Sequence, residues 1–458
     1  MIADPSMTNR SSAEKIAQAT QGFLDKQTSP VTKLVESFEN TSRLVYDPAT
    51  SRFETGSKEY LESQCFVYDG ALAAIAYSLL REFERAKDIL SIFEWNFHYA
   101  KGDHIGLFNA YRTDAHADAS RLLSMGIDGD RMHAGPNIWV GLAAYQYTML
   151  SGDIQLFPLC LEMIKWVIHR IPHYSPLDGV RGGIAMGSGW GPNWKEIYST
   201  EHNIDYFALL NIVASCFKNP DLEGMIKASA LRFEEICEEQ TATLSWLLRR
   251  VFDKTEHRFN TGINEAGIDR VRALDTTSFA ILGIGPRCLM DNEVDPIRLI
   301  EGVEKHLQVS VNVENEIITG FDFTDAEGHG GNRPPVIWIE GTYQMVLAYQ
   351  EMANFYHSEG NKTNEAYWRR KAEFLAKQTE RLTDLLSSDQ QIPPYTSARP
   401  KSTEIMTTFK ENWEIQRTDS SLAVKSVASA VWRFLAASRF NPMSAIRAPQ
   451  SFPRERSL

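Results

Sequence analysis

Two acidic residues lie one helical turn apart in the segment STEHNIDYF, which covers residues 199–207. On a helix, Glu201 and Asp205 would project from the same face, where their negative charges repel each other. Such a pair adds nothing to the stability of a helix. Crowding and burial do raise the pKa of a carboxyl group, so that one of the two can stay protonated near neutral pH. The pair therefore indicates acid–base chemistry.

Further acids stand at the start of other apolar segments with helical periodicity. Asp69, Asp275 and Glu340 each lie within the first three residues of such a segment. Any one of them has an alternative interpretation as a helix N-cap or first-turn acid, which the helix dipole favours. Capping does not require an acid at nearly every start, and it does not require Asp205 inside a helix. We therefore expect these acids to belong to one site.

The elements that must position these acids are read from the apolar periodicity of the chain, which predicts about twelve helices in six consecutive hairpins. The first helix of each pair is mostly the more apolar one, as expected for an inner ring covered by an outer ring with one wet face. The predicted pairs are 69–80 with 84–97, 137–150 with 154–171, 203–217 with 221–250, 275–285 with 296–308, 338–360 with 364–386, and 420–440 with a helix near 32–44.

This pattern predicts an all-α fold, an (α/α)6 barrel with a few short β segments in its loops. We expect one domain over residues 16–443, a flexible segment over 1–15 and a tail over 444–458. Alternate helices of such a ring point in the same direction. The N-terminal ends of the inner helices, and the acids there, should therefore meet on one face.

Aromatic residues accompany the acids. Trp190 and Trp194 lie in a glycine-rich segment just before Glu201, Trp338 lies two residues before Glu340, and Tyr68 precedes Asp69. Flat aromatic faces suit pyranose rings, so we predict sugar contacts here. By contrast, Trp139, Trp246 and Trp432 have helical spacing and are predicted to pack in the core. The other predicted substrate contacts are Asn109, Tyr111, His133, His202, Asn203 and Asp205. In this role Asp205 would orient sugar hydroxyls or His202 instead of raising the pKa of Glu201.

The composition excludes some classes of binding partner. A formal net charge of −12 argues against nucleic acids and anionic membranes, which require a positive surface. No segment approaches the roughly eighteen consecutive apolar residues of a transmembrane helix. The N-terminus shows no apolar signal region, which makes the cytoplasm the default location and leaves export without a signal open. Nothing in the sequence indicates an oligomeric state.

Signals for metals and cofactors are weak. The five cysteines are scattered without a CxxC pair, which indicates buried free thiols rather than a disulfide framework or a zinc site. Asp114, His116 and Asp118 alternate as metal ligands can, but no second cluster accompanies them. The segment GHGGN (328–332) lacks the GK[ST] of a phosphate loop, and neither GxSxG nor HExxH occurs. We therefore predict neither a metal nor a cofactor.

Five short motifs carry a resemblance to a known family. They occur in the order YDGAL (68–72), TEHNID (200–205), LDTTS (274–278), WIEGTYQ (338–344) and FNP (440–442), across nearly the whole chain. With these motifs the chain resembles the six-hairpin glycosidase superfamily, which has the (α/α)6 toroid fold. More narrowly, it is similar to bacterial glycosidase-like proteins with a TEHNID motif. The resemblance implies that catalytic acids lie at the open end of the toroid.

Together these observations predict a glycoside hydrolase that acts on a glucan-like oligo- or polysaccharide. In such enzymes one carboxylic acid protonates the leaving oxygen while a second carboxylate activates water or attacks the anomeric carbon. Inversion is expected by analogy with the superfamily. We assign Glu201 as the proton donor and Asp69 or Glu340 as the opposing base, with Asp275 as the next candidate.

Two alternatives stay open at the level of the sequence. A polysaccharide lyase or a sugar epimerase on the same toroid would use Tyr, His or Arg, for which Tyr68, Arg112, His133 and His202 are available. A carbohydrate-binding protein without catalysis is the other. Acids deep in the pocket would favour hydrolysis, and basic residues there would favour a lyase.

Overall fold

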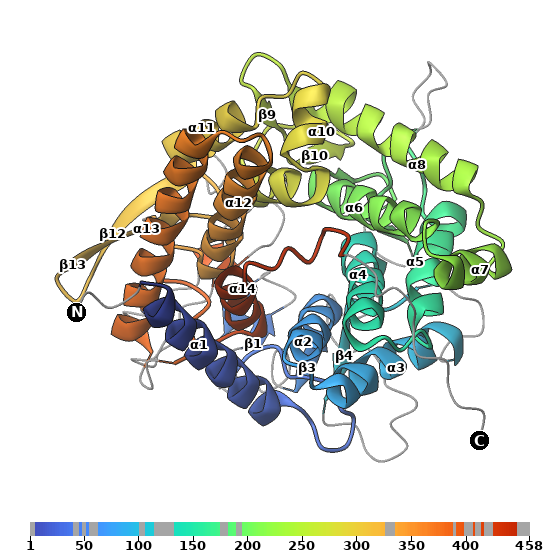
Figure 1. Ribbon diagram of the computed structural model, residues 1–458, viewed down its shortest axis with the longest axis horizontal. Coiled ribbons are helices and arrows are strands. Elements are labelled where there is room, and N and C mark those ends of the chain that lie inside the picture. Colours follow the sequence, from blue (N-terminus) through green and yellow to red (C-terminus); the bar gives the residue numbers. More distant parts are fainter. Residues whose placement is uncertain are drawn as a thin grey trace.

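The helices of the computed structural model form two concentric rings, with the inner ring buried (Figure 1). The described residues are 5–39, 45–47, 52–54, 63–99, 106–113, 132–174, 182–188, 195–325, 335–387, 391–397, 406–407, 414–415 and 425–446.

Each inner helix packs against the next one, and α14 packs against α2, which closes the ring. The inner helices are α2 (Val67–Leu79), α4 (Ala134–Ser151), α6 (Thr200–Cys216), α9 (Asp275–Phe279) with the π-helical turn η3 (Ala280–Ile284), α12 (Ile339–Ser358) and α14 (Val427–Ser438). Their apolar residues point in all directions, as expected for helices that are covered on every side. The predicted (α/α)6 barrel is confirmed.

Each outer helix packs on an inner partner, in the order α14, α2, α4, α6, α9 and α12. The outer helices are α1 (Pro5–Gln27), α3 (Phe83–Tyr99), α5 (Phe157–Arg170), α8 (Phe233–Trp246), α11 (Pro296–Leu307) and α13 (Lys362–Leu386). One face of each is apolar, as in α11, where Leu299, Ile300, Val303 and Leu307 are buried. Shorter elements connect the rings, namely α7 (Pro220–Ala228), η2 (Leu247–Val251) and α10 (Pro286–Asp291).

The helix predicted near 32–44 is wrong as the partner of the last inner helix. Residues 31–39 are irregular, and α1 takes that place against α14. The inward face of α1 carries Ile16, Thr20, Phe23, Leu24 and Gln27 at helical spacing, all buried. The polar residues Thr20 and Gln27 interrupt the apolar periodicity of this face, so the sequence pattern does not reveal the helix. Helix α1 also begins at Pro5, inside the segment predicted as flexible, while the domain boundaries themselves stay a prediction.

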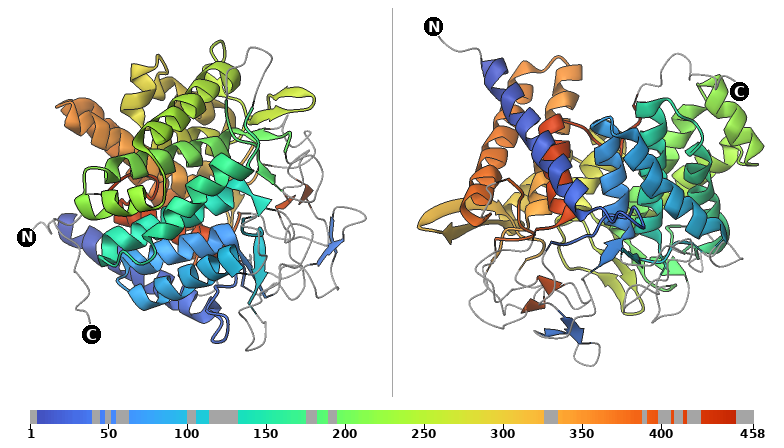
Figure 2. Two further views of the ribbon diagram at one scale, coloured as in Figure 1. Left: turned by 90° about the vertical axis from the view of Figure 1, so that its right-hand side faces the viewer. Right: turned by 90° about the horizontal axis from the view of Figure 1, so that it is seen from below.

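Short antiparallel strands gather at one end of the ring (Figure 2). Three of them, β3, β5 and β7, lead directly into the inner helices α2, α4 and α6. The pairs are β1 (Val45–Asp47) with β2 (Arg52–Glu54), β3 (Gln64–Phe66) with β4 (Ala110–Arg112), β5 (Met132–His133) with β6 (Gly187–Ser188), β10 (Gly262–Asn264) with both β7 (Tyr198–Ser199) and β11 (Gly267–Asp269), β8 (Phe252–Asp253) with β9 (Arg258–Phe259), β12 (Gln308–Val313) with β13 (Glu316–Phe321), and β14 (Met406–Thr407) with β15 (Glu414–Ile415).

Polar side chains in the first turns of the inner helices fasten the preceding loops. On α4, the amide of Asn137 accepts a hydrogen bond from the backbone N–H of Leu107 at 2.7 Å and donates to the carbonyl of the same residue at 3.0 Å. On α6, Asn203 forms the same pair of bonds with Ile184, at 2.7 and 3.0 Å. These bonds fix the strand end of the ring, where the acids lie.

Candidate active site

The four predicted catalytic acids lie at the N-terminal ends of four different helices of the inner ring. Asp69 is in the first turn of α2, Glu201 in that of α6, Asp275 at the start of α9 and Glu340 in the first turn of α12. The positive end of each helix dipole faces these carboxyls. The parallel direction of the inner helices therefore brings together acids that are up to 271 positions apart, from Asp69 to Glu340.

Glu201 has the strongest perturbation among them. Burial raises the pKa of its carboxyl well above the ordinary value, and repulsion from Asp275, Asp205 and Glu340 raises it further. No cation is among these causes. Both effects favour the protonated carboxyl, which is the form required of a general acid.

The other three acids have pKa values near neutrality. Burial raises the pKa of Asp69 to about 7, although hydrogen bonds from Ser37 and the backbone N–H of Ala428 oppose the shift. Burial also raises the pKa of Asp275 to about 7, against backbone hydrogen bonds at the start of its own helix. These two groups exchange protons readily in the physiological range.

Glu340 is held by side chains. Burial raises its pKa to about 8, repulsion from Asp69 and Asp275 adds to this, and hydrogen bonds from Tyr68 and Gln344 oppose it. The Tyr68 hydroxyl lies 2.9 Å from Glu340 Oε1, and Gln344 Nε2 lies 3.2 Å from the same oxygen.

Asp205 lies one turn below Glu201 and is only 1% exposed. Neither of its carboxylate oxygens has a hydrogen bond of normal geometry within the described residues. Burial raises its pKa well above the ordinary value, the Trp139 indole lowers it, and repulsion from Asp275 raises it. A charged carboxylate in this place would be costly, so burial favours the protonated form of Asp205. When Asp205 is ionised, its charge disfavours loss of the proton from Glu201.

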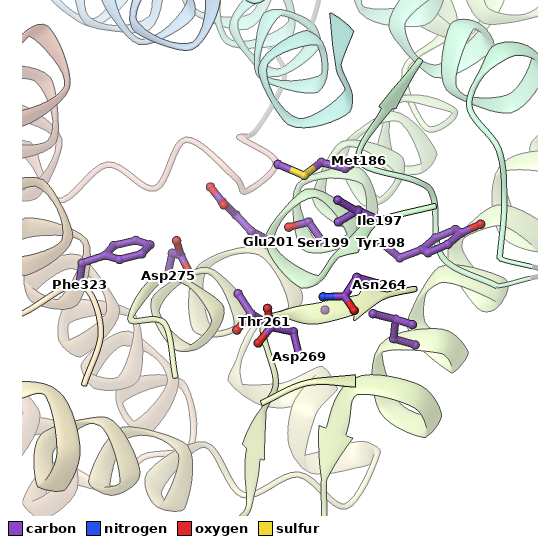
Figure 3. Close-up of a pocket in the computed structure, with 12 residues that line it drawn as sticks. Met186, Ile197, Tyr198, Ser199, Glu201, Thr261, Asn264, Asp269, Asp275 and Phe323 are labelled. Carbon is purple, nitrogen blue, oxygen red and sulfur yellow. The ribbon is translucent and has the colours of Figure 1, made fainter. Parts of the chain in front are cut away.

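A cleft opens beside Glu201 and Asp275, with about 530 Å³ of empty space that is partly open to solvent. Figure 3 shows both carboxyls reaching toward the same space from α6 and α9, with Asn264 and Asp269 on the neighbouring strands β10 and β11. The remaining wall consists of Met186, Ile197, Tyr198, Ser199, Thr261, Gly262, Ile263 and Phe323. Its lining combines apolar residues with a few polar groups, which is typical of small-molecule sites.

Two histidines stand behind this wall. The rings of His133 and His202 are 6.4 Å apart. His202 is buried, and burial together with the nearby His133 lowers its pKa to about 3. Because His202 stays neutral and is a very weak base at physiological pH, it is unsuited to proton abstraction.

Several residues predicted as substrate contacts also have partners within the protein, and their contact with substrate stays a prediction. All three hydrogen-bonding positions used by the amide of Asn203 go to backbone groups, of Ile184 and of Ser199 at 2.7 Å. The Tyr111 hydroxyl accepts a hydrogen bond from the backbone of Phe108, and the side chain is buried. Asn109 is half-buried next to β4, where its carbonyl accepts the N–H of Val67.

One of the tryptophans predicted to contact sugar lies within the described residues, and the other two do not. Trp338 is buried and packs edge-on against Phe323 with ring centroids 4.7 Å apart, so it supports the cleft wall rather than offering a free face. Trp190 and Trp194 lie outside the described residues, and so do Asp114, His116 and Asp118 of the possible metal motif.

Among the residues that the structure does describe, no three acidic, histidine or cysteine side chains are placed to hold a metal ion. Within the same residues, no helix has the length and apolarity needed to cross a membrane.

Replacing Asn203 with alanine is expected to lower the free energy of unfolding by about 2 to 4 kcal/mol, because the backbone N–H and carbonyl of Ile184 lose their buried partner. KM should stay within about twofold. Urea unfolding and steady-state kinetics test both points. Asn211→Ala on the same helix is the control, since that side chain accepts only one hydrogen bond, from Gln240. A raised KM with unchanged stability would restore Asn203 as a substrate contact.

Sequence reasoning missed several residues of the site. Asn264 and Asp269 come from a hairpin that has no helical period and lies some sixty positions after Glu201. Burial raises the pKa of the Tyr395 phenol, and Glu340 and Asp69 lie close enough to raise it further. Trp432 was predicted only as packing, yet its indole N–H donates to the Tyr68 hydroxyl at 2.8 Å. No local pattern indicates these partners, because they depend on closure of the ring.

The comparisons with known proteins concern the fold. No family model and no curated protein sequence matches the chain. Among solved structures, an α-mannanase of glycoside hydrolase family 76 from Bacteroides thetaiotaomicron has 9% sequence identity and a TM-score of 0.55, over 94% of this chain and 95% of its own. A family 76 glycoside hydrolase from a bovine strain of the same species has 11% identity and a TM-score of 0.52, over 93% and 77%.

A third similar structure is a glycosidase in which a glutamate is replaced by alanine, in complex with glucose. It has 9% identity and a TM-score of 0.55, over 93% of this chain and 97% of its own. At such low identity the likeness concerns the backbone alone. The chain thus has the fold of these glycosidases, a toroid of six helical hairpins.

Proposed function

We propose that the protein is a glycoside hydrolase whose acid–base residues are the carboxyls at the strand end of the toroid. One observation carries the proposal: the carboxyls of Glu201 and Asp275 line the same cleft, and burial raises the pKa of both. Hydrolysis of a glycosidic bond needs one protonated and one ionised carboxyl, and raised pKa values favour a protonated donor near neutral pH. The glycosidase fold of the chain supports the same reaction class.

In this mechanism Glu201 donates its proton to the glycosidic oxygen as the bond to the anomeric carbon breaks. A carboxylate across the substrate, for which Asp69, Glu340 and Asp275 are the candidates, takes a proton from the attacking water. An ionised Asp205 would act on Glu201 by disfavouring its ionisation.

The substrate proposed is a neutral hexose oligo- or polysaccharide. The described lining of the cleft contains no Lys, Arg or His side chain that would pair with a uronate or phosphate. Ser199, Thr261 and Asn264 offer uncharged hydrogen-bonding groups, and Phe323 offers an aromatic surface. Glucose bound in one similar structure supports a glucan, and the α-mannanase among the neighbours makes α-mannan the second substrate to test.

The same lining disfavours the alternatives. A lyase would need a basic group facing a uronate, and the described lining has none. An epimerase would need two accessible histidine bases, but His202 is buried with a pKa of about 3. A carbohydrate-binding protein without catalysis is the outcome that the activity assay separates from hydrolysis.

Wild-type protein is expected to release reducing ends from at least one polysaccharide in a panel of α-glucans, β-glucans including β-1,2-linked oligomers, and α-mannan. The anomer formed first, observed by ¹H NMR, should be inverted relative to the substrate. Retention would replace the water-activating base with a nucleophilic carboxylate. Silence on the whole panel, with a thermal shift on one sugar, would contradict hydrolysis and favour a binding protein.

A further inference from the structure

The cleft beside Glu201 has a polar wall that does not belong to the acid cluster. The hairpin of β10 and β11 contributes Asn264 and Asp269 to its lining. In Figure 3 these two residues lie to the right of Glu201, whereas Asp275 and Phe323 lie to its left. The cleft therefore extends from Glu201 toward the hairpin, away from Asp275.

The sugar whose anomeric carbon reacts belongs beside the acid cluster. Repulsion from Asp275 raises the pKa of both Glu201 and Glu340, which shows that these three carboxyls converge within the ring. Neither Asp69 nor Glu340 is part of the described lining of the cleft. Glu201 thus borders both spaces. The sugar that leaves with the donated proton on its glycosidic oxygen extends into the cleft on the other side of Glu201.

The hairpin is fastened to the start of α6, next to Glu201. The backbone N–H of Thr200 donates to the carbonyl of Thr261 at 2.9 Å, and the Thr200 hydroxyl donates to the carbonyl of the residue before it at 2.6 Å. Strand β10 also approaches β7 closely, because a Cβ at Gly262 would lie only 2.2 Å from the Tyr198 carbonyl oxygen. These contacts fix the position of the hairpin relative to Glu201.

Asn264 and Asp269 project from one face of the hairpin. In the register of the two strands, Asn264 lies opposite Gly267 and Asp269 lies opposite Gly262. The two polar side chains are therefore diagonal neighbours, which share a face because side chains alternate along a strand. A Cβ at Gly267 would meet no atom within 4 Å, so the space beside Asn264 is open.

Each of these side chains has one polar atom occupied and another available. Asn264 Oδ1 accepts from the backbone N–H of Ala266 at 2.9 Å, and Asp269 Oδ1 accepts from that of Val271 at 3.1 Å. These bonds orient both groups. Within the part of the chain that the structure describes, the amide N–H groups of Asn264 and Oδ2 of Asp269 have no hydrogen-bond partner. The wall thus offers a donor beside an acceptor.

We infer that Asn264 and Asp269 form the subsite for the leaving sugar of a neutral oligosaccharide, with Asp269 accepting from one hydroxyl and Asn264 donating to another. A donor beside an acceptor complements a pair of sugar hydroxyls, because a hydroxyl both donates and accepts. An acidic leaving sugar would be repelled by the Asp269 carboxylate and would find no cation in the described lining. This inference rests on the proposed glycoside hydrolase function and names the residues that select the departing group.

Asp269→Ala is the informative variant, measured on two substrates. One is the oligosaccharide that wild type cleaves. The other is the glycosyl fluoride of the same sugar, whose leaving group is fluoride and needs no sugar subsite. The ratio of kcat/KM for the oligosaccharide to kcat/KM for the fluoride should fall about tenfold to a hundredfold, since hydrogen bonds to a charged group are the stronger ones. Asn264→Ala should lower the same ratio about threefold to tenfold.

Asp253→Ala is the matched control. Asp253 also lies half-buried in a two-stranded hairpin, and it accepts from the backbone N–H groups of Thr255 and Glu256 at 2.9 and 3.1 Å. It is not part of the described lining of the cleft. Its replacement should keep the substrate ratio within about twofold of wild type, whatever the effect on the melting temperature. The control thus separates the loss of a turn hydrogen bond from the loss of a sugar contact.

A second readout does not depend on turnover. In protein labelled with ¹⁵N-asparagine, the side-chain amide resonance that disappears in Asn264→Ala reports on this subsite. The probes are methyl α-glucoside, methyl β-glucoside and methyl α-mannoside. At least one of them should shift this resonance saturably, and Asp269→Ala should weaken the binding of that probe about tenfold or more. Asp253→Ala should leave its binding unchanged.

The outcomes separate the two proposals. An active wild type whose substrate ratio is unchanged in Asp269→Ala and Asn264→Ala would overturn the subsite and leave the hydrolase function in place. Equal losses on both substrates give this unchanged ratio and would overturn it too. A wild type that cleaves nothing would refute hydrolysis and with it the leaving-group role. The amide titration would still decide whether the hairpin binds sugar, because the absence of any saturable shift would exclude it.

Discussion

Replacing Glu201 with glutamine is expected to lower kcat about a thousandfold, to leave sugar binding nearly unchanged and to leave the melting temperature unchanged or higher. The amide has the shape of the carboxylic acid but no acidic proton, and general acid catalysis contributes about a hundredfold to ten thousandfold. Glu201 is half-buried beside the cleft, and burial and neighbouring acids raise the pKa of its carboxyl, so an uncharged amide in its place should not lower the stability of the fold. Reducing-end release and thermal unfolding measure the two effects.

Two comparisons make this result specific. Glu234→Gln is the control, because Glu234 also lies in the first turn of an α-helix, α8, but is exposed on the outer ring. It should retain full activity. A 2,4-dinitrophenyl glycoside of the cleaved sugar needs little protonation of its leaving group, so Glu201→Gln should lose far less activity on it. Equal losses on both substrates would exclude Glu201 as the proton donor.

The inner ring could be predicted from the sequence because helices that are buried on all sides are apolar on every face. Residues 69–80 and 338–360 were expected as helices, and α2 and α12 occupy Val67–Leu79 and Ile339–Ser358. The apolar periodicity of the outer helices is harder to recognise, since only one face of each is apolar. The single segment expected over 221–250 is divided into α7, α8 and η2, with Ala230 at a positive φ of 66° between the helices.

The common location of the acids also followed from the sequence, because helix direction and first-turn position decide it. The contacts of each carboxyl could not be predicted from the sequence. Tyr68 and Trp432 are 364 positions apart and meet only because α14 closes the ring against α2. A tryptophan at helical spacing has the same local pattern whether or not its N–H donates to a side chain of another helix. Such roles become visible only with the tertiary contacts.

The acid cluster should also make the fold less stable as the pH rises. The pKa values of Asp69, Asp275 and Glu340 are about 7, 7 and 8 in the folded protein, against about 4 in an unfolded chain. Between these limits the folded state binds more protons than the unfolded state. Stability is therefore highest below about pH 4, as far as these groups determine it, and falls until about pH 8, where both states have released the protons.

Asp275→Asn is expected to stabilise the protein at pH 8 and to leave its stability at pH 4 nearly unchanged. Asparagine keeps an oxygen for the backbone N–H of Thr276 but cannot ionise. A difference of about three pKa units corresponds to roughly 4 kcal/mol, so we expect a gain of about 2 to 4 kcal/mol at pH 8. Urea unfolding at both pH values measures this gain.

Asp221→Asn is the matched control for this prediction, because Asp221 occupies the first turn of α7 and is exposed to solvent. It should show no gain that grows with pH. The same Asp275→Asn variant should lose activity if the acid cluster performs the reaction, since groups held in an unfavourable charged environment stabilise a transition state at the expense of the fold. A stability gain at pH 8 without loss of activity would place Asp275 outside the catalytic machinery. Equal stability of variant and wild type at both pH values would show instead that its carboxyl titrates as it does in water.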